Sequence, residues 1–128
     1  DCTVTGSYLL LYRAVYNLVE NAIKYNHPGG KVTVKISQKK AVPDPSEPSH
    51  TTDCAFVEIS DTGIGISPEF QEKIFAPFFR VDKSRSRAMG GAGLGLALVN
   101  EIARQHGGQV KVVESSEKGS TIALILPC

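Results

Sequence analysis

Two asparagines, a lysine and a tyrosine recur at spacings that place them on one side of a helix. Asn17, Asn21, Lys24 and Tyr25 stand at i, i+4, i+7 and i+8, which at about 100° per residue is one helical face. Amide oxygens are hard, neutral ligands that suit Mg²⁺, a metal that also keeps waters and nucleotide phosphates. Lys24 adds a point charge for phosphate. A plain solvated face would have the same pattern, so this set alone leaves both interpretations open.

The segment from Asp61 to Ile66 reads Asp-Thr-Gly-Ile-Gly-Ile and directly follows a strand-like run. An aspartate at a strand end can accept a hydrogen bond from an exocyclic amine. Gly63 and Gly65 allow the backbone to approach a flat ring closely. The same residues are common in an ordinary turn that ends a strand, so the pattern by itself supports a base-binding site and a turn equally.

A dense glycine run, Gly90-Gly91-Ala92-Gly93-Leu94-Gly95-Leu96, leads into a helical pattern. Exposed backbone N–H groups and a helix N-terminus together favour an anion, so we predict a phosphate site rather than a flexible linker. The chain has no GxxxxGK followed by Ser or Thr, and neither glycine cluster satisfies GxGxxG. A P-loop, a Rossmann loop and a protein-kinase glycine loop are therefore excluded.

Between the two glycine clusters lies an aromatic segment, Phe75-Ala76-Pro77-Phe78-Phe79-Arg80, followed by Lys83, Arg85 and Arg87. Aromatic residues around a proline are typical of a packing anchor. The basic residues are placed to close over phosphates, although each one alone is equally consistent with a solvated loop.

The composition restricts the class of protein. The chain has 128 residues, 41% of them apolar, and a net charge of +1, which predicts one globular domain over 1–128 with neither nucleic acid nor a membrane surface as partner. Its three cysteines, Cys2, Cys54 and Cys128, are odd in number and lack a CxxC spacing. We therefore expect neither a disulfide framework nor a zinc site, and a reducing compartment. None of the three histidines is placed like a nucleophile.

These residues require elements to position them. Periodicity predicts a helix over 8–25, with a serine cap and an apolar stripe nearly opposite the asparagines. Glycines at 107 and 108 should end a second long helix. The remaining elements are strands at 2–5, 31–38, 55–60, 109–114 and 120–126, a short helix at 67–75, the second long helix at 94–106 and a mobile loop at 39–53. This order is α+β: a mixed, mainly antiparallel sheet of about five strands with three helices on one face.

Taken in order, the motifs resemble those of histidine kinase ATP-binding domains. The segment 17–25 resembles the N box, 61–65 the first glycine box, 75–80 the F box, 91–96 the second glycine box and 119–121 the last. The resemblance covers nearly the whole chain. It implies the two-layer α/β sandwich of the Bergerat fold, which is shared with gyrase, Hsp90 and MutL. Ala92 and Glu117 depart from the family's usual residues.

The resemblance also implies roles for individual residues. Asn21 would coordinate Mg²⁺ with Asn17 beside it, and Asp61 would accept from the adenine amino group of ATP. Arg80 and a lid at 81–92 would enclose the γ-phosphate. The other implied contacts are Lys24 and Tyr25 with phosphates or ribose, Gly63, Gly65 and Ile66 around adenine, Gly91, Gly93, Leu94, Gly95 and Leu96 at the phosphates, and Thr121 under the adenine.

The implied reaction transfers the γ-phosphoryl group of ATP to a histidine on a separate dimerisation domain, with a response regulator downstream. The asparagine amide at position 17 cannot take a proton from water, which disfavours hydrolysis. An ATP-gated clamp that uses Glu20, an anti-sigma-type serine kinase and a non-catalytic binding module remain as alternatives. We expect a cytoplasmic domain of a membrane-anchored sensor, with the accepting histidine and the membrane segments ahead of Asp1, and a chain that alone does not autophosphorylate.

Overall fold

Strand β4 (Gly119–Pro127) has nearly every residue buried. Its run Ile-Ala-Leu-Ile-Leu is apolar on both faces, which is typical of a central strand covered on two sides. A computed structural model describes residues 2–77 and 95–128 and places β4 inside a four-stranded sheet of order β1-β2-β4-β3. Every strand pair described is antiparallel.

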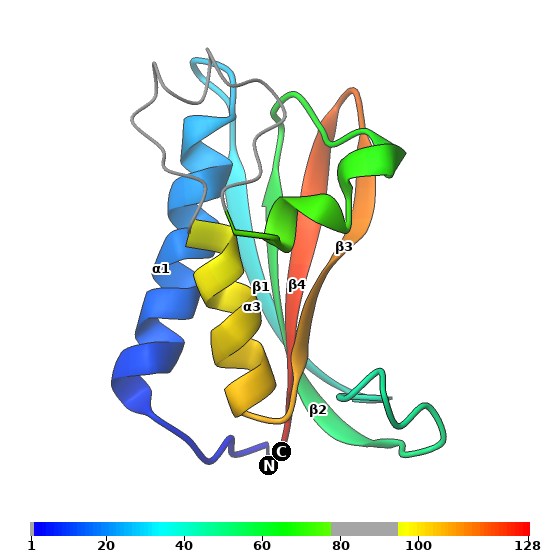
Figure 1. Ribbon diagram of the computed structural model, residues 1–128. Helices are drawn as coiled ribbons and strands as arrows, with labels where there is room; N and C mark the ends of the chain where they lie inside the picture. Colours follow the sequence, from blue (N-terminus) through cyan, green and yellow to red (C-terminus); the bar gives the residue numbers. More distant parts are fainter. Residues whose placement is uncertain (1, 78–94) are drawn as a thin grey trace.

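The chain forms two layers, with helices on one face of the sheet (Figure 1). The other elements, with β4, are α1 (Tyr8–Lys24), β1 (Val32–Ala41), β2 (Thr52–Asp61), η1 (Pro68–Phe70), η2 (Lys73–Phe75), α3 (Gly95–Gln105) and β3 (Gln109–Ser116). Leu18 of α1, Ile102 of α3 and Leu124 of β4 are almost fully buried where the two layers meet. The predicted α/β sandwich is confirmed.

Several predicted details were wrong. Residues 2–5 form no strand, so the described sheet has four strands and no parallel pair. The hairpin of β1 and β2 extends into the segment predicted as a loop, because Ala41 pairs with Thr52 and only 42–51 connects the strands. The predicted short helix at 67–75 is two separate 3₁₀ turns.

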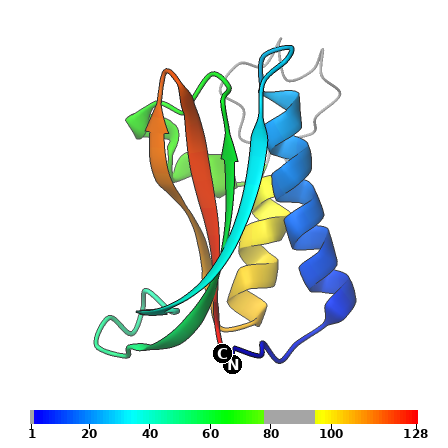
Figure 2. The same cartoon turned by 180° about the vertical axis from the view of Figure 1, so that it is seen from behind.

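Strand β1 lies at an edge of the sheet and is less covered than its alternation predicts. Val32 packs against the core, but Val34 and Ile36 are 47% and 73% exposed. The helices lie mainly over the other strands (Figure 2). The alternation therefore identified the correct side of the strand, while the position of β1 at the edge leaves that side open.

His106 links the start of α1 to the end of α3, which lies beside it. Ser7 caps α1 by accepting from Leu10 N at 3.2 Å, as predicted, and its own N–H donates to His106 Nε2 at 3.0 Å. His106 Nδ1 lies 2.8 Å from Ile102 O and must donate to it, since a carbonyl only accepts. The imidazole is therefore neutral, with its proton on Nδ1. Beyond it Gly107, at φ +74°, ends α3 as predicted.

The prediction of three reduced cysteines was wrong for one pair. Cys2 and Cys128 form a disulfide, with their Cα atoms 5.2 Å apart. The segment before α1 runs back to the end of β4 (Figures 1 and 2), a proximity that a sequence separation of 126 conceals. Cys54 is a free, buried thiol, and its burial raises its pKa.

Replacing His106 by alanine removes two hydrogen bonds of the imidazole, one to Ser7 at the start of α1 and one to Ile102 within α3. We expect the free energy of unfolding to fall by about 2 kcal/mol, at roughly 1 kcal/mol for each bond. Urea denaturation followed by circular dichroism measures this change. His50→Ala, in the exposed connection between β1 and β2, is the control and should change stability by less than about 0.5 kcal/mol. Equal losses in the two variants would contradict the assigned role of His106.

Candidate functional site

Asn17 lies on the side of α1 that faces α3. Its Nδ2 donates to Arg13 O at 2.7 Å, which orients the amide. A methyl group added to Gly95, the first residue of α3, would lie 3.1 Å from Asn17 Oδ1. Asn17 is half-buried between two helices, so its oxygen is presented to a space that lies between them and is open to solvent.

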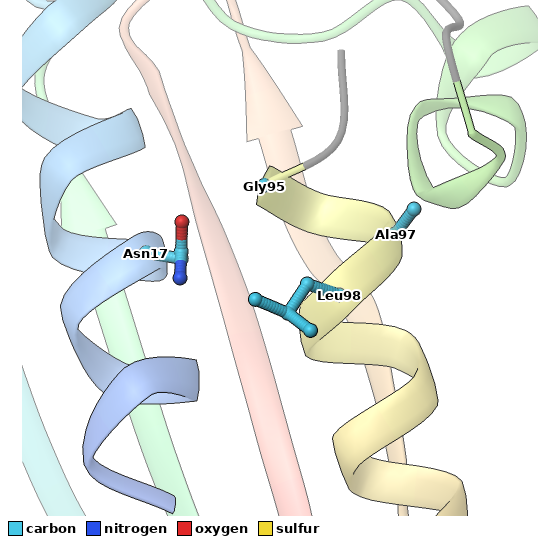
Figure 3. Close-up of a pocket in the computed structure, with 4 residues that line it drawn as sticks. All are labelled: Asn17, Gly95, Ala97 and Leu98. Carbon is cyan, nitrogen blue, oxygen red and sulfur yellow. The ribbon is translucent and has the colours of Figure 1, made fainter. Parts of the chain in front are cut away.

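That space is a pocket of about 520 Å³ between the helices. Among the described residues Asn17, Gly95, Ala97 and Leu98 line it, and the Asn17 amide points across it toward α3 (Figure 3). Leu96 is half-buried and packs against the core instead. The glycine at the start of α3 leaves the Asn17 oxygen uncovered, so a ligand can approach it there.

The other predicted residues of α1 lie at its C-terminal end. Asn21 is half-buried, and its side chain makes no hydrogen bond within 2–77 and 95–128. Lys24 Nζ lies 3.5 Å from Glu20 Oε1, with both side chains partly exposed. Tyr25 ends the helix, and its carbonyl accepts from Ile64 N at 3.3 Å. The end of α1 is therefore bonded directly to the loop that follows β2.

Asp61 is held at the end of β2 by three hydrogen bonds. Its Oδ1 accepts from Gly63 N at 2.9 Å and from Ser120 N at 3.3 Å. Its Oδ2 accepts from Ser120 Oγ at 3.0 Å. A carboxylate oxygen has two lone pairs, so Oδ2 keeps one for a further donor. This group, called here the Asp61 cluster, is a rigid acceptor of the kind that an exocyclic amine requires.

Ser120 is a site residue that sequence reasoning missed, and Thr121 was named in its place. Thr121 Oγ1 instead lies 2.7 Å from Ser60 Oγ. Successive side chains of a strand point to opposite faces, so Thr121 and Asp61 lie on opposite sides of the sheet. The alternation in β4 contained the signal, because Ser120 is in phase with the core residues Ile122 and Leu124.

The glycines of the loop after β2 are required by backbone contacts. A methyl group on Gly63 would collide with Tyr25 O. Gly65 has φ +75°, and a methyl group there would collide with Ser116 O of β3. Ile66 N donates to Ser115 Oγ at 2.6 Å. The loop is thus fixed between α1 and β3, and Ile66 is held on the side where the Asp61 cluster lies.

Several predicted residues lie outside the described part of the chain. These are Arg80, Gly91, Gly93, Leu94 and the lid at 81–92, together with the basic residues Lys83, Arg85 and Arg87. Within the described ranges there is no group of three or more His, Cys, Asp or Glu residues that could hold a metal ion. The two amide oxygens of α1 are neutral, hard donors of a kind that could bind Mg²⁺.

The chain matches the family model of histidine kinase-, DNA gyrase B- and HSP90-like ATPases over residues 6–128. It is 42% identical over 124 residues to the sensor-like histidine kinase SenX3 of Mycobacterium tuberculosis, covering 97% of this chain and 27% of that protein. It is 38% identical over 116 residues to the histidine protein kinase SaeS of Staphylococcus aureus, covering 91% and 30%. The chain thus spans between a quarter and a third of these relatives.

Solved structures agree with this assignment. The mycobacterial sensor histidine kinase MprB superposes with a TM-score of 0.76 at 34% identity, covering 97% of this chain and 74% of the other. Full-length ShkA in complex with AMPPNP gives 0.77 at 25% identity, covering 99% and 23%. The chain belongs to the histidine kinase-, DNA gyrase B- and HSP90-like ATPase family, and lies within it among the sensor histidine kinases, of which this domain is the catalytic, ATP-binding part.

Gly29 and Gly65 have nearly equal positive φ angles but different surroundings. Replacing each by alanine therefore distinguishes the cost of backbone strain from the cost of a steric collision. Gly29→Ala at φ +79°, with open space around it, should cost about 1 kcal/mol from the left-handed conformation alone. Gly65→Ala at φ +75° adds the collision with Ser116 O and should cost about 1 to 3 kcal/mol more. Thermal denaturation of both variants measures the difference. Equal losses would show that the loop is not held against β3.

Proposed function

We propose that the chain binds Mg-ATP beside α1 and α3 and donates the γ-phosphoryl group to a histidine on a separate dimerisation domain. It would thus act as the catalytic part of a two-component sensor histidine kinase, with 1–128 as one ATP-binding domain. The single observation that carries the proposal is the Asp61 cluster, a fixed carboxylate with a free lone pair beside a glycine loop. The family's ATPase description supports ATP as the nucleotide.

At the base, Asp61 Oδ2 would accept from the adenine amino group. Ser120 would hold the carboxylate in position, which replaces the role first given to Thr121. Guanine carries a carbonyl oxygen where adenine carries its amino group, so two acceptors would face each other and GTP would bind less well. Gly63, Gly65 and Ile66 would form the wall of this end of the site.

At the phosphates, Asn21 would bind the metal with Asn17 beside it, and Lys24 would contribute positive charge. Mg²⁺ would neutralise charge on the β- and γ-phosphates. Arg80 and the lid at 81–92 would enclose the γ-phosphate, and Gly91, Gly93, Leu94 and Gly95 would donate backbone N–H groups. Leu96 would support the start of α3, and Tyr25 would lie near the ribose or phosphates.

The residues near the phosphate end favour transfer to a nucleophile over hydrolysis. Asn17 carries an amide, which cannot accept a proton from water. Glu20, the acid that an ATP-driven clamp would need, is paired with Lys24 and 43% exposed. A neutral imidazole is already a nucleophile near neutral pH, so the domain need supply no base. Of this chain's histidines, His106 has both ring nitrogens engaged.

The partners follow from the same proposal. The accepting histidine would lie on a dimerisation domain of the same full-length protein, and a response regulator would receive the phosphoryl group afterwards. No helix among the described residues is long and apolar enough to cross a membrane. We propose a membrane-anchored parent whose ATP-binding domain lies in the cytoplasm, without contact to the bilayer or to nucleic acid.

Calorimetric titration with Mg²⁺ and AMPPNP tests the base and metal ends together. Asp61→Asn should weaken binding about 10- to 100-fold. Ser120→Ala removes the hydroxyl bond to Asp61 Oδ2 but keeps the backbone N–H bond to Oδ1, so it should weaken binding up to about 10-fold. Thr121→Ala, the matched control on the opposite face, should leave it unchanged. Asn21→Ala should chiefly reduce the dependence on Mg²⁺. Equal affinity of the wild type for GTP and ATP would contradict the role of Asp61.

Radiolabelled ATP tests the acceptor. The chain alone should gain no acid-labile phosphate, and mixing it with a histidine-bearing dimerisation domain of a related kinase should label only that domain. Asn17→Asp supplies a carboxylate where the amide stands, so it should raise ATP hydrolysis relative to wild type. Stable phosphohistidine on the isolated chain, or hydrolysis that is lost in Glu20→Ala, would refute the proposal.

A further inference from the structure

Helix α1 has a second apolar stripe that the fold leaves uncovered. Leu9, Tyr12, Tyr16, Val19 and Ile23 follow one another at spacings of three and four, which is the a/d pattern of helices that pack along a shared seam. Val19 is half-buried and also packs against the core, whereas the other four are 61%, 57%, 55% and 62% exposed, in chain order. The core already takes a different stripe with Leu18 at its centre. We call these five residues the outer seam.

Exposed apolar side chains also occur on the edge strand β1. Strand β1 begins beside the C-terminal end of α1 and diverges from the helix along its length (Figure 2). Its exposed Val34 and Ile36 are in phase with Val32, which packs on the core side, so they lie on the same side of the sheet as α1. Among the described residues no strand pairs with the free edge of β1. Exposed apolar side chains on a helix and on the same side of a free edge strand are typical of a protein interaction site.

Charges beside the outer seam indicate which partner fits it. Arg13 and Glu20 stand seven residues apart, both at e positions when Leu9, Tyr16 and Ile23 are taken as a. In an antiparallel pair of identical helices, e positions face e positions. With Tyr16 opposite Val19 of the partner subunit, Arg13 of each copy lies opposite Glu20 of the other. The surface is therefore self-complementary in charge about a two-fold axis.

We propose that the outer seam is a dimer contact between two copies of this chain, with their α1 helices antiparallel. The two β1 edges would then approach each other below the helices. The contact would leave the nucleotide site open, because Asn17 faces α3 rather than the seam. This proposal does not depend on nucleotide binding, so either one can fail alone.

The size of the surface predicts a weak dimer. Helix α1 has 17 residues, so at about 1.5 Å per residue the seam is roughly 25 Å long. A single helical seam of this length is short for a stable interface, which buries about 800 Å² per partner. We therefore expect a dissociation constant on the order of 10 to 100 μM, which a tether between two parent chains would make significant.

Sedimentation velocity between about 5 and 500 μM tests the proposal. The wild type should shift from monomer to dimer over this range, and Tyr16→Ser should stay monomeric. Arg13→Glu and Glu20→Arg should each weaken the dimer about 10-fold, because each places like charges opposite one another twice. The double variant should return to within about threefold of wild type. Val113→Ser, 51% exposed on β3, is the control and should dimerise as the wild type does.

Four outcomes would overturn the proposal. The wild type could remain monomeric at the highest concentration, or Tyr16→Ser could dimerise unchanged. The double variant could fail to recover, which would show that Arg13 and Glu20 do not face each other across the dimer. A dimer held by an intermolecular disulfide, seen on a non-reducing gel, would also exclude the seam. Circular dichroism melts establish that each variant is folded.

Discussion

The hydrogen bonds to Asp61 are the constraint on which the rest of the site depends. They connect Asp61, the last residue of β2, to Ser120 near the start of β4 and to Gly63 in the loop that follows β2. The same loop is bonded to Tyr25 at the end of α1 and to Ser115 on β3. One carboxylate therefore joins the sheet, the glycine loop and the helix that carries both asparagines.

Local rules predicted most of the elements. The Ser7 cap, the apolar stripe of α1 and the glycine at 107 each act within a few residues, so periodicity and capping rules identified them. Thr121 was chosen over Ser120 because motif order was applied without the alternation of the strand, which places only Ser120 beside Asp61. The remaining errors concern contacts between distant segments.

Those distant contacts have no local signature. The Cys2–Cys128 disulfide joins residues separated by 126 positions, and the bond from Ser7 to His106 spans 99. The exposure of Val34 and Ile36 depends on β1 lying at the edge of the sheet. The spacing of the outer seam can be read from the sequence, but only the position of the core shows that most of its side chains stay exposed.

The central claim is that one nucleotide joins the Asp61 cluster to the asparagines of α1. A crystal of the chain grown with Mg²⁺ and a non-hydrolysable ATP analogue tests it most directly. The adenine amino group should lie within hydrogen-bonding distance of Asp61 Oδ2, and the metal should be bound by the amide oxygen of Asn21. A nucleotide bound elsewhere, with Asp61 contacting only Gly63 and Ser120, would contradict the account.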